Sequence, residues 1–219
     1  MVDPLSEVIA LLRPRAVFTK GISGAGRWGV RYADFGHPSF AVVIEGACLL
    51  AVDGQPPLTL EAGDFVLLPK TPGFTMTGFE PVVPTLIDPN LAMAATEEVR
   101  HGQQDGPPDL RMLGGYFLFD GEDSGLLVSL LPAQVHVRGV ERLSVLVKLL
   151  VEEAAGWHSG RDLVLTRLIE ILLVESLRQA QTSDAPAGLL RVAQASTFST
   201  AFSRHVGQPP GRYARATAH

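Results

Sequence analysis

Aromatic and hydrogen-bonding side chains in the first two thirds of the sequence could form a site for a small molecule. The candidate residues are Trp28, Tyr32, His37, Phe40, Tyr116 and His136. Such a site is typically an apolar cavity in which rings supply contact area and a few polar groups orient the ligand. Strand alternation places Trp28 and Tyr32 on one face and leaves the faces of the other residues undetermined. The competing interpretation is that these residues form ordinary core.

The sequence carries none of the common catalytic signatures. It lacks a Gly-x-Ser-x-Gly elbow, a Gly-Lys-Ser phosphate loop, a Cys-x-x-Cys pair and a His-Glu-x-x-His motif. The glycine-rich stretch "GISGAGRWG", residues 21–29, has no helix behind it that could bind a phosphate, so it predicts a hairpin turn. The adjacent acidic pairs at 97–98 and 152–153 face different directions and are typical of a solvated surface. No catalytic residue is predicted.

Composition predicts a globular chain. With 219 residues, 46% of them hydrophobic, the chain can bury a full core in one or two domains. No apolar run approaches the roughly 18 residues that a membrane span needs. The N-terminus carries acids where a secretion signal would carry positive charge, so we expect a cytoplasmic location and no membrane partner. Cys48 is the single cysteine, lies in an apolar run, and predicts a small core residue.

The charge is distributed unevenly. The net charge of −5 argues against nucleic-acid binding, but no acid follows Pro186, and that last stretch contains four arginines: Arg191, Arg204, Arg212 and Arg215. An acidic body with a basic tail indicates a polyanionic partner such as DNA. Because four arginines neutralise few phosphates, we expect weak binding that is strongest at low salt.

Strand and helix patterns divide the chain into two parts. Short Val-, Leu-, Phe- and Tyr-rich segments separated by Gly, Pro and Asp predict an antiparallel barrel or sandwich between Ala16 and Val137. Strands are expected at 15–20, 27–35, 40–46, 47–54, 57–60, 64–69, 74–79, 112–119, 125–132 and 134–137. The polar segment 87–110 is expected to be a surface excursion or a lid.

Helices are expected at both ends of this region. Asp3 can cap a short helix that ends before Pro14. After Gly139 the apolar period becomes helical over 140–156 and again over 161–181. The second of these helices carries an unusually wide apolar stripe, which predicts a dimer interface that includes Leu172 and Leu173.

The order of these elements resembles that of the AraC-type transcription regulators whose sensor is a cupin barrel. The segments "DPLSEVIALLRPR", "FAVVIEGACLLAVDGQPPLTLEAGDFVLLPK", "GGYFLFDG" and "VLTRLIEILLVESLR" carry the resemblance, and "FSTAFSRHVGQPPGRY" is similar to the family's recognition helix. The resemblance implies an α+β fold: a mainly-β cupin barrel (a double-stranded β-helix, or jelly roll), then an α-helical pair and a short C-terminal helical tail. The implied domains are a ligand-sensing barrel at 1–139, a dimerisation pair at 140–181, and a linker with a partial helix-turn-helix at 182–219.

The tail departs from the family in ways that leave two alternatives open. Residues 181–219 have room for one partial helix-turn-helix unit where the family has two, and "LLRVAQAS" leads into "TFSTAF" too early for the usual turn. By position, the resemblance implies DNA contacts at Ser199, Thr200, Ser203, Arg204 and Arg212, although the family often has Arg or Lys at 200 and 203. The alternative is a remnant helix that packs its apolar face onto the sensor or a dimer mate, because a recognition helix needs supporting helices to hold its angle.

Many cupins hold a catalytic metal with inward histidines and a glutamate. Here His37 and Glu45 stand near the expected positions, but a second histidine is missing, and Gly73 and Phe74 stand where another is expected. We therefore expect no metal, no cofactor and no enzymatic activity. Three hypotheses remain: a dimeric DNA-binding regulator that senses an unidentified effector, a stand-alone cupin sensor and dimerisation protein without DNA binding, and, least supported, a metal-dependent cupin enzyme.

Overall fold

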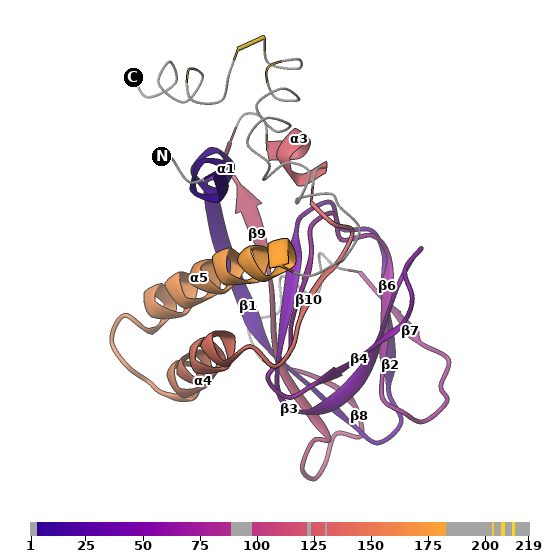
Figure 1. Cartoon of the computed structure of the whole chain (residues 1–219). Helices are drawn as coiled ribbons and strands as arrows, with labels where there is room; N and C mark the ends of the chain where they lie inside the picture. Colours follow the sequence, from indigo (N-terminus) through magenta and orange to yellow (C-terminus); the bar gives the residue numbers. More distant parts are fainter. Residues whose placement is uncertain are drawn as a thin grey trace.

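The structure is a computed structural model that describes residues 4–88, 98–121, 124–129 and 131–182, together with the single residues 203, 207, 208 and 212. A curled sheet forms the barrel, and two helices lie against its outer side (Figure 1). The mainly-β barrel followed by a helical pair, as the sequence predicts, is confirmed. The predicted linker and most of the tail lie outside the described residues.

Among the described residues, ten strands form one continuous sheet. The main path runs β7-β2-β6-β3-β9-β1-β8, with β4 and β5 also paired to β3, and β10 paired to β5. The strands are β1 (Pro14–Ala25), β2 (Gly29–Tyr32), β3 (Ser39–Val52), β4 (Leu58–Glu61), β5 (Phe65–Leu68), β6 (Phe74–Thr77), β7 (Thr85–Ile87), β8 (Val99–Gly102), β9 (Leu110–Phe119) and β10 (Val135–Val137).

The long strand β3 joins the two halves of the barrel. Its first part, from Ser39, pairs with β5 and β9, and its last part, to Val52, pairs with β4 and β6. The register against β9 shifts between Val43 and Glu45. An irregularity of this kind increases local bend and twist, which lets one strand turn from one half of the barrel into the other.

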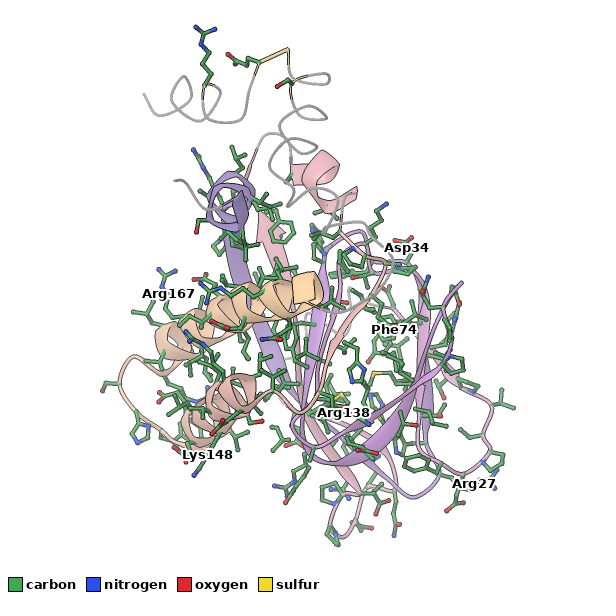
Figure 2. The ribbon with its side chains drawn as sticks, in the orientation of Figure 1. Arg27, Asp34, Phe74, Arg138, Lys148 and Arg167 are labelled. Atoms are coloured by element: carbon green, nitrogen blue, oxygen red, sulfur yellow. The ribbon has the colours of Figure 1, made fainter. Side chains whose placement is uncertain are left out.

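The part of the sheet that includes β5 is covered on both faces. Phe65 and Leu67 pack toward the helices, whereas Val66 and Leu68 pack inside the barrel, and all four are buried. A strand covered on both sides shows a continuous apolar run in place of alternation, which explains the sequence "FVLL". Figure 2 shows Phe74 on the barrel side and Lys148 and Arg167 on the two helices at the other side.

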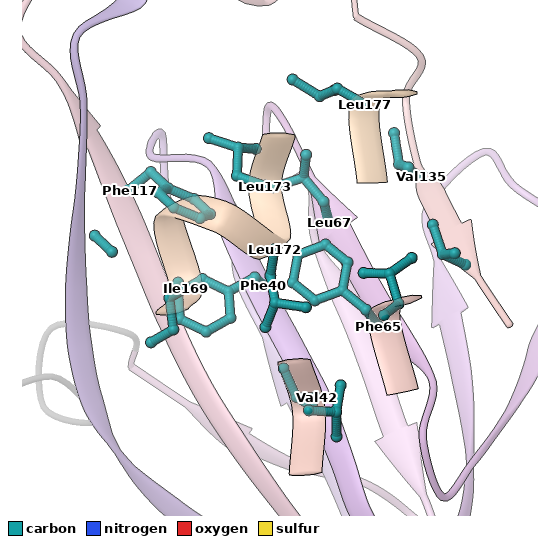
Figure 3. Close-up of a cluster of buried hydrophobic side chains, with 14 of the residues drawn as sticks. Phe40, Val42, Phe65, Leu67, Phe117, Val135, Ile169, Leu172, Leu173 and Leu177 are labelled. Carbon is teal, nitrogen blue, oxygen red and sulfur yellow. The ribbon is translucent and has the colours of Figure 1, made fainter. Parts of the chain in front are cut away.

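The described part of the chain has four helices beside the sheet: α1 (Pro4–Leu12), α3 (Ser124–Ser129), α4 (Glu141–Ala155) and α5 (Arg161–Thr182). Helix α5 lies across the outer face of the sheet, where its Ile169, Leu172 and Leu173 contact the cluster that contains Phe40 and Phe117 (Figure 3). Leu172 and Leu173 are fully buried within this one chain. Their predicted place in a dimer interface is therefore wrong, because the sheet already covers them.

Other local predictions differ from the structure, including the two strands expected at 40–46 and 47–54, which form the single strand β3. Residues 125–132 were expected as a strand, but Ser124–Ser129 form helix α3, which lies beside α1. The stretch at 21–29 was expected as a hairpin turn, but β1 continues through it to Ala25. The expected surface excursion at 87–110 is only partly right: residues 103–107 are exposed and lie outside any strand, but β8 pairs in parallel with β1, and residues 89–97 lie outside the described residues. Within the described residues, no helix combines the length and apolar character that crossing a membrane requires.

Candidate functional site

The barrel contains a cavity of about 130 Å³ that is partly open to solvent. Strands from both halves of the sheet line it, and most of its surface is apolar or aromatic. Its aromatic lining residues are Trp28, Tyr32, Phe35, Phe40, Phe74, His101 and Tyr116. Tyr32 stacks on Phe74, with their ring centroids 4.9 Å apart. Burial raises the pKa of Tyr32 above its ordinary value, so its phenol group stays protonated at neutral pH.

Glycines make room for the Trp28 indole ring at one wall of the cavity. A Cβ atom added at Gly24 would lie 2.5 Å from Trp28 Cε2, and one at Gly78 would lie 3.1 Å from Trp28 Nε1. Gly102 has a φ of 77°, and a Cβ there would lie 2.2 Å from the carbonyl oxygen of Ala25. Larger residues at these positions would displace the indole ring or the strand beside it.

His101 on β8 lines the cavity with its ring. Its ring stacks on Trp28 with a centroid distance of 6.1 Å, and its Nε2 atom is buried without a hydrogen-bond partner in the described part of the chain. Burial lowers the pKa of His101 below its ordinary value, so the ring is neutral at neutral pH. The neighbouring Arg100 is anchored elsewhere, because its Nε donates to Gln103 O at 2.8 Å.

Thr71 forms hydrogen bonds to several segments at one part of the cavity wall. It is buried, with a φ of 39°, and its hydroxyl oxygen accepts a hydrogen bond from the Ser39 N–H at 2.9 Å. The same hydroxyl lies within hydrogen-bond distance of the carbonyl oxygens of His37 and Leu68. The Phe35 N–H donates to the Thr71 carbonyl oxygen at 3.2 Å. The polar groups of Thr71 are therefore occupied by the protein itself.

The predicted ligand-binding residues do not all reach the cavity. Trp28, Tyr32 and Tyr116 line it. Phe40 also lines it, but its ring packs toward α5, with its centroid 5.1 Å from that of Phe117. His37 lies outside the lining, exposed, with its ring 5.7 Å from that of Tyr116.

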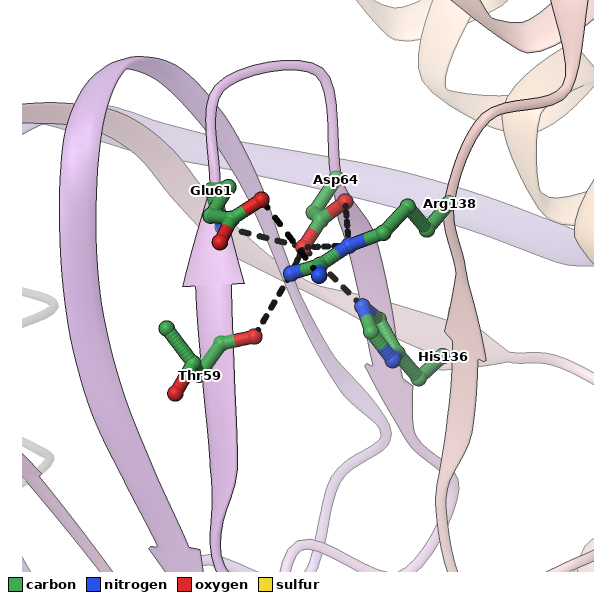
Figure 4. Close-up of polar contacts among 5 residues, drawn as sticks. All are labelled: Thr59, Glu61, Asp64, His136 and Arg138. Atoms are coloured by element: carbon green, nitrogen blue, oxygen red, sulfur yellow. Dashed lines mark hydrogen bonds and ion pairs between the residues drawn. The ribbon is translucent and has the colours of Figure 1, made fainter.

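His136 lies in a polar cluster, apart from the cavity lining (Figure 4). Its Nε2 is 3.0 Å from Asp64 Oδ2, and Arg138 Nη2 donates to the same oxygen at 2.6 Å. The Glu61 N–H also donates to Asp64 Oδ2, at 2.9 Å. Although burial alone would raise it, hydrogen bonds from Arg138, Glu61 and His136 hold the pKa of Asp64 below its ordinary value. This cluster joins β4, β5 and β10.

The described residues do not match the metal site of a cupin enzyme. His37 is exposed, and Glu45 forms an ion pair with Arg111 at 3.5 Å, with both side chains more than half exposed. His101 lines the cavity, but in the described ranges no group of three His, Cys, Asp or Glu side chains is placed to hold a metal ion.

His101 was missed because the sequence "VRHG" lies inside a polar segment that predicts a surface excursion. Val99 and His101 both line the cavity, two residues apart, while Arg100 bonds to a loop. This short alternation, with a single apolar residue, was the available signal, and it is too weak to distinguish a strand from a loop.

Most of the predicted DNA contacts cannot be placed. Ser199, Thr200 and Arg204 lie outside the described residues. Ser203 is half-buried and Arg212 is exposed. The Gly207 N–H donates to the Ser203 carbonyl oxygen at 3.0 Å, and Gly207 has a φ of 77°. This combination is typical of a glycine at the C-terminal end of a helix.

Comparison with known proteins shows the relationships of the chain. Residues 3–181 match the cupin family. A Streptomyces lividans protein described as an AraC-like transcription regulator is 31% identical over 183 residues, which covers 80% of this chain and 59% of that protein. A Streptomyces antibioticus protein with the same description is 31% identical over 211 residues, which covers 90% of this chain and 68% of that protein. The chain thus spans about two thirds or less of the length of these relatives.

Two solved structures are more distantly similar. ToxT from Vibrio cholerae, in a form bound to an unsaturated fatty acid, gives a TM-score of 0.43 at 8% identity, covering 89% of this chain and 70% of ToxT. YhaK from Escherichia coli gives a TM-score of 0.32 at 8% identity, covering 56% of this chain and 42% of YhaK. Likenesses at this level do not inform the ligand or the partners of this chain.

Proposed function

The chain belongs to the cupin-containing AraC-like transcription regulators, and on this premise we propose that it is a dimeric, cytoplasmic regulator that binds a small molecule in its barrel and DNA through the stretch after Thr182. This proposal treats the barrel as a sensor and not as an enzyme. It keeps Trp28, Tyr32 and Tyr116 as ligand-contacting residues and adds His101.

The observation that carries this proposal is the position of β3 between the cavity and helix α5. Ala41 lines the cavity from β3, whereas Phe40 and Val42 on the same strand pack in the cluster that contains Ile169 and Leu172 of α5. A ligand that prefers one position of β3 would thereby favour one position of α5. Ligand binding would then shift the population of helix arrangements and, in a dimer, the spacing of the two DNA-binding stretches.

The extent of the sequence match supports a role for the tail. The Streptomyces antibioticus relative aligns with 90% of this chain, so the alignment extends past the cupin match that ends at residue 181. Separately, the chain after Pro186 carries four arginines and no acid. Both features favour contact with the DNA backbone over a purely apolar packing role.

A salt titration of binding to random duplex DNA tests this proposal. The full chain is compared with a chain that ends at Ser183, which retains every described helix and strand. We expect the full chain to bind with a log–log salt slope of about −3, and the shorter chain to lose binding, because each neutralised phosphate contributes about −0.9 to the slope.

Single substitutions refine this test. Arg204→Ala and Arg212→Ala should each weaken binding and reduce the slope by about one. Arg15→Ala is the matched control, because Arg15 lies on the barrel and pairs with Asp120. Equal, weak binding by the full and shortened chains would contradict DNA binding and favour the stand-alone sensor.

A further inference from the structure

We propose that the barrel cavity binds an uncharged aromatic group of its ligand through contacts with aromatic side chains, and that it excludes sugars and other polyols. This inference rests on the proposed sensing function, because it names the class of molecule that the barrel would sense. The rings of the wall, its lack of charged side chains and its occupied hydroxyl groups each support it.

The first argument is the aromatic wall. Tyr32 and Phe74 form a stacked pair in the lining, with ring centroids 4.9 Å apart, and Phe35 meets Tyr116 edge to face at 5.4 Å. Trp28 adds a fifth ring. Aromatic rings in offset or edge-to-face contact gain free energy beyond that of burying their area. A flat aromatic group is therefore favoured at this wall over an aliphatic group of the same area.

Two methionines belong to the buried part of the wall. Met76 and Met112 both line the cavity, and a thioether sulfur makes favourable contacts with aromatic rings. The flexible methionine side chain also adapts to the shape of a ligand. Because the cavity is partly open to solvent, a ligand longer than the cavity can extend through the opening.

The second argument is charge. Within the described part of the chain, no Asp, Glu, Lys or Arg lines the cavity. A charged group inserted among the lining side chains would lose its water without gaining a counter-charge, which is costly. A charge carried at the opening would keep its water. The inserted group is therefore uncharged, even where another part of the ligand carries a charge.

The third argument is that the wall offers few hydrogen bonds to a ligand. Thr71 Oγ1 lies 2.9 Å from Ser39 Oγ and within hydrogen-bond distance of two carbonyl oxygens, so both hydroxyl groups already bond to the protein. His101 Nε2 is buried and closed to a ligand. Tyr32 and Tyr116 are the tyrosines of the lining, and both are partly exposed. A sugar buried in this cavity would leave several hydroxyl groups without partners, which is costly.

An experiment that fills the cavity tests the location of the site. The full chain is titrated with N-phenyl-1-naphthylamine, an uncharged aromatic dye whose emission rises in apolar surroundings. Ala41→Phe adds a ring to the cavity wall from β3, and should weaken dye binding by at least about tenfold because the ring occupies the space. Ala51→Phe is the matched control, because it adds the same ring to the same strand at an exposed position outside the lining. Dye binding should be unchanged in this control.

Competition with the dye tests the class of ligand. Toluene and methylcyclohexane share one carbon skeleton and differ in aromaticity, and glucose represents the polyols. We expect toluene and methylcyclohexane to displace the dye. Glucose should not displace it at any concentration at which toluene does, because its hydroxyl groups would be buried without partners.

Phe74→Leu measures the contribution of one ring. This substitution keeps an apolar side chain and removes the ring that stacks on Tyr32. It should lower the ratio of toluene affinity to methylcyclohexane affinity by about threefold, the equivalent of one aromatic contact. Comparing this ratio between proteins cancels the different solubilities of the two probes. Phe79→Leu should leave the ratio unchanged, because Phe79 is 61% exposed and lies outside the lining.

Four results would overturn the proposed ligand class: no saturable dye signal, equal dye binding by Ala41→Phe and Ala51→Phe, displacement of the dye by glucose, or an unchanged affinity ratio in Phe74→Leu. Ala41→Leu repeats the first test if Ala41→Phe does not fold, as judged by circular dichroism. None of these results affects the DNA salt titration, which tests the regulator function separately.

Discussion

Cys48 illustrates how the barrel interior suppresses the chemistry of a reactive side chain. Its thiol is fully buried, and burial together with the nearby charge of Asp64 raises its pKa to about 12. Because only the thiolate reacts with alkylating reagents, we expect iodoacetamide to modify native Cys48 about a thousandfold more slowly than the unfolded chain at neutral pH. Mass spectrometry with and without urea measures both rates, and equal rates would contradict a buried thiol.

Asp64 gives the molecule a specific sensitivity to acid. Its pKa is held below the ordinary value, so the ionised form favours the folded state. That contribution is complete above the pKa of an Asp side chain in the unfolded protein, about 3.9. It is lost as the pH falls through the lower pKa that Asp64 has in the folded protein. We expect the free energy of unfolding to fall steeply below about pH 4, and less steeply in Asp64→Asn.

Urea unfolding at a series of pH values measures this dependence. Asp53→Asn is the matched control: hydrogen bonding to Arg31 also lowers the pKa of Asp53, but both side chains are substantially exposed. Exposed ion pairs contribute little to stability. In this variant the free energy of unfolding should therefore depend on pH as it does in the wild type. If the free energy of unfolding of Asp64→Asn fell with pH as steeply as that of the wild type, the cluster in Figure 4 would not be the cause of the loss of stability in acid.

At the scale of the elements, two neighbouring residues of helix α5 differ sharply in burial. Leu172 is fully buried against the sheet, whereas Ile171 is 45% exposed. Val164, about two helical turns earlier on α5, and Leu149 on α4 are also exposed. Such apolar side chains on the outer faces of the helical pair favour an interface with a second chain.

Substitutions at Ile171 and Leu172 test the proposed dimer. We expect Ile171→Glu to produce folded monomers, because the charge would be buried only on association. Leu172→Glu should instead lower the free energy of unfolding by about 4 kcal/mol, because it places a charge in a packed core. Analytical ultracentrifugation gives the mass, and circular dichroism the stability. An Ile171→Glu dimer with unchanged affinity would mean that the interface lies elsewhere.

Periodicity predicted the two long helices better than the short elements. The apolar spacing that begins at Val140 and again at Leu163 repeats over several turns, so both α4 and α5 were expected within one residue of their observed bounds. The run at 125–132 is too short for its period to distinguish a helix from a strand, and α3 was mistaken for a strand. The turn expected at 21–29 was wrong because pairing with β9 holds the glycines of β1 in the sheet.

Residues of the cavity wall were predictable where the residue type alone indicated such a position. Large rings are enriched in cavity walls, so Trp28, Tyr32 and Tyr116 were identified without knowledge of their neighbours. His101 could not be identified, because its position depends on the parallel pairing of β8 with β1, which brings it opposite Gly24. His136 was expected at the cavity because nothing in its local sequence indicates Asp64, which lies 72 positions away.

At the scale of the whole molecule, two hydrophobic clusters share the strands between them. One cluster lies between the sheet and the helices and includes Phe40 and Leu173, and the other lies inside the barrel and includes Trp28 and Met112. Adjacent residues of β3 and β5 alternate between the two clusters. The packing of the barrel and that of the helical pair are therefore coupled through the same backbone.

The cavity also gives the two sides of the sheet different mechanical properties. The cluster beneath α5 is filled by leucine and phenylalanine side chains, whereas the barrel side retains an internal space of about 130 Å³. Hydrostatic pressure favours states in which such internal space is eliminated. Compression would therefore act first on the barrel walls, and a molecule that occupied the cavity would reduce this effect.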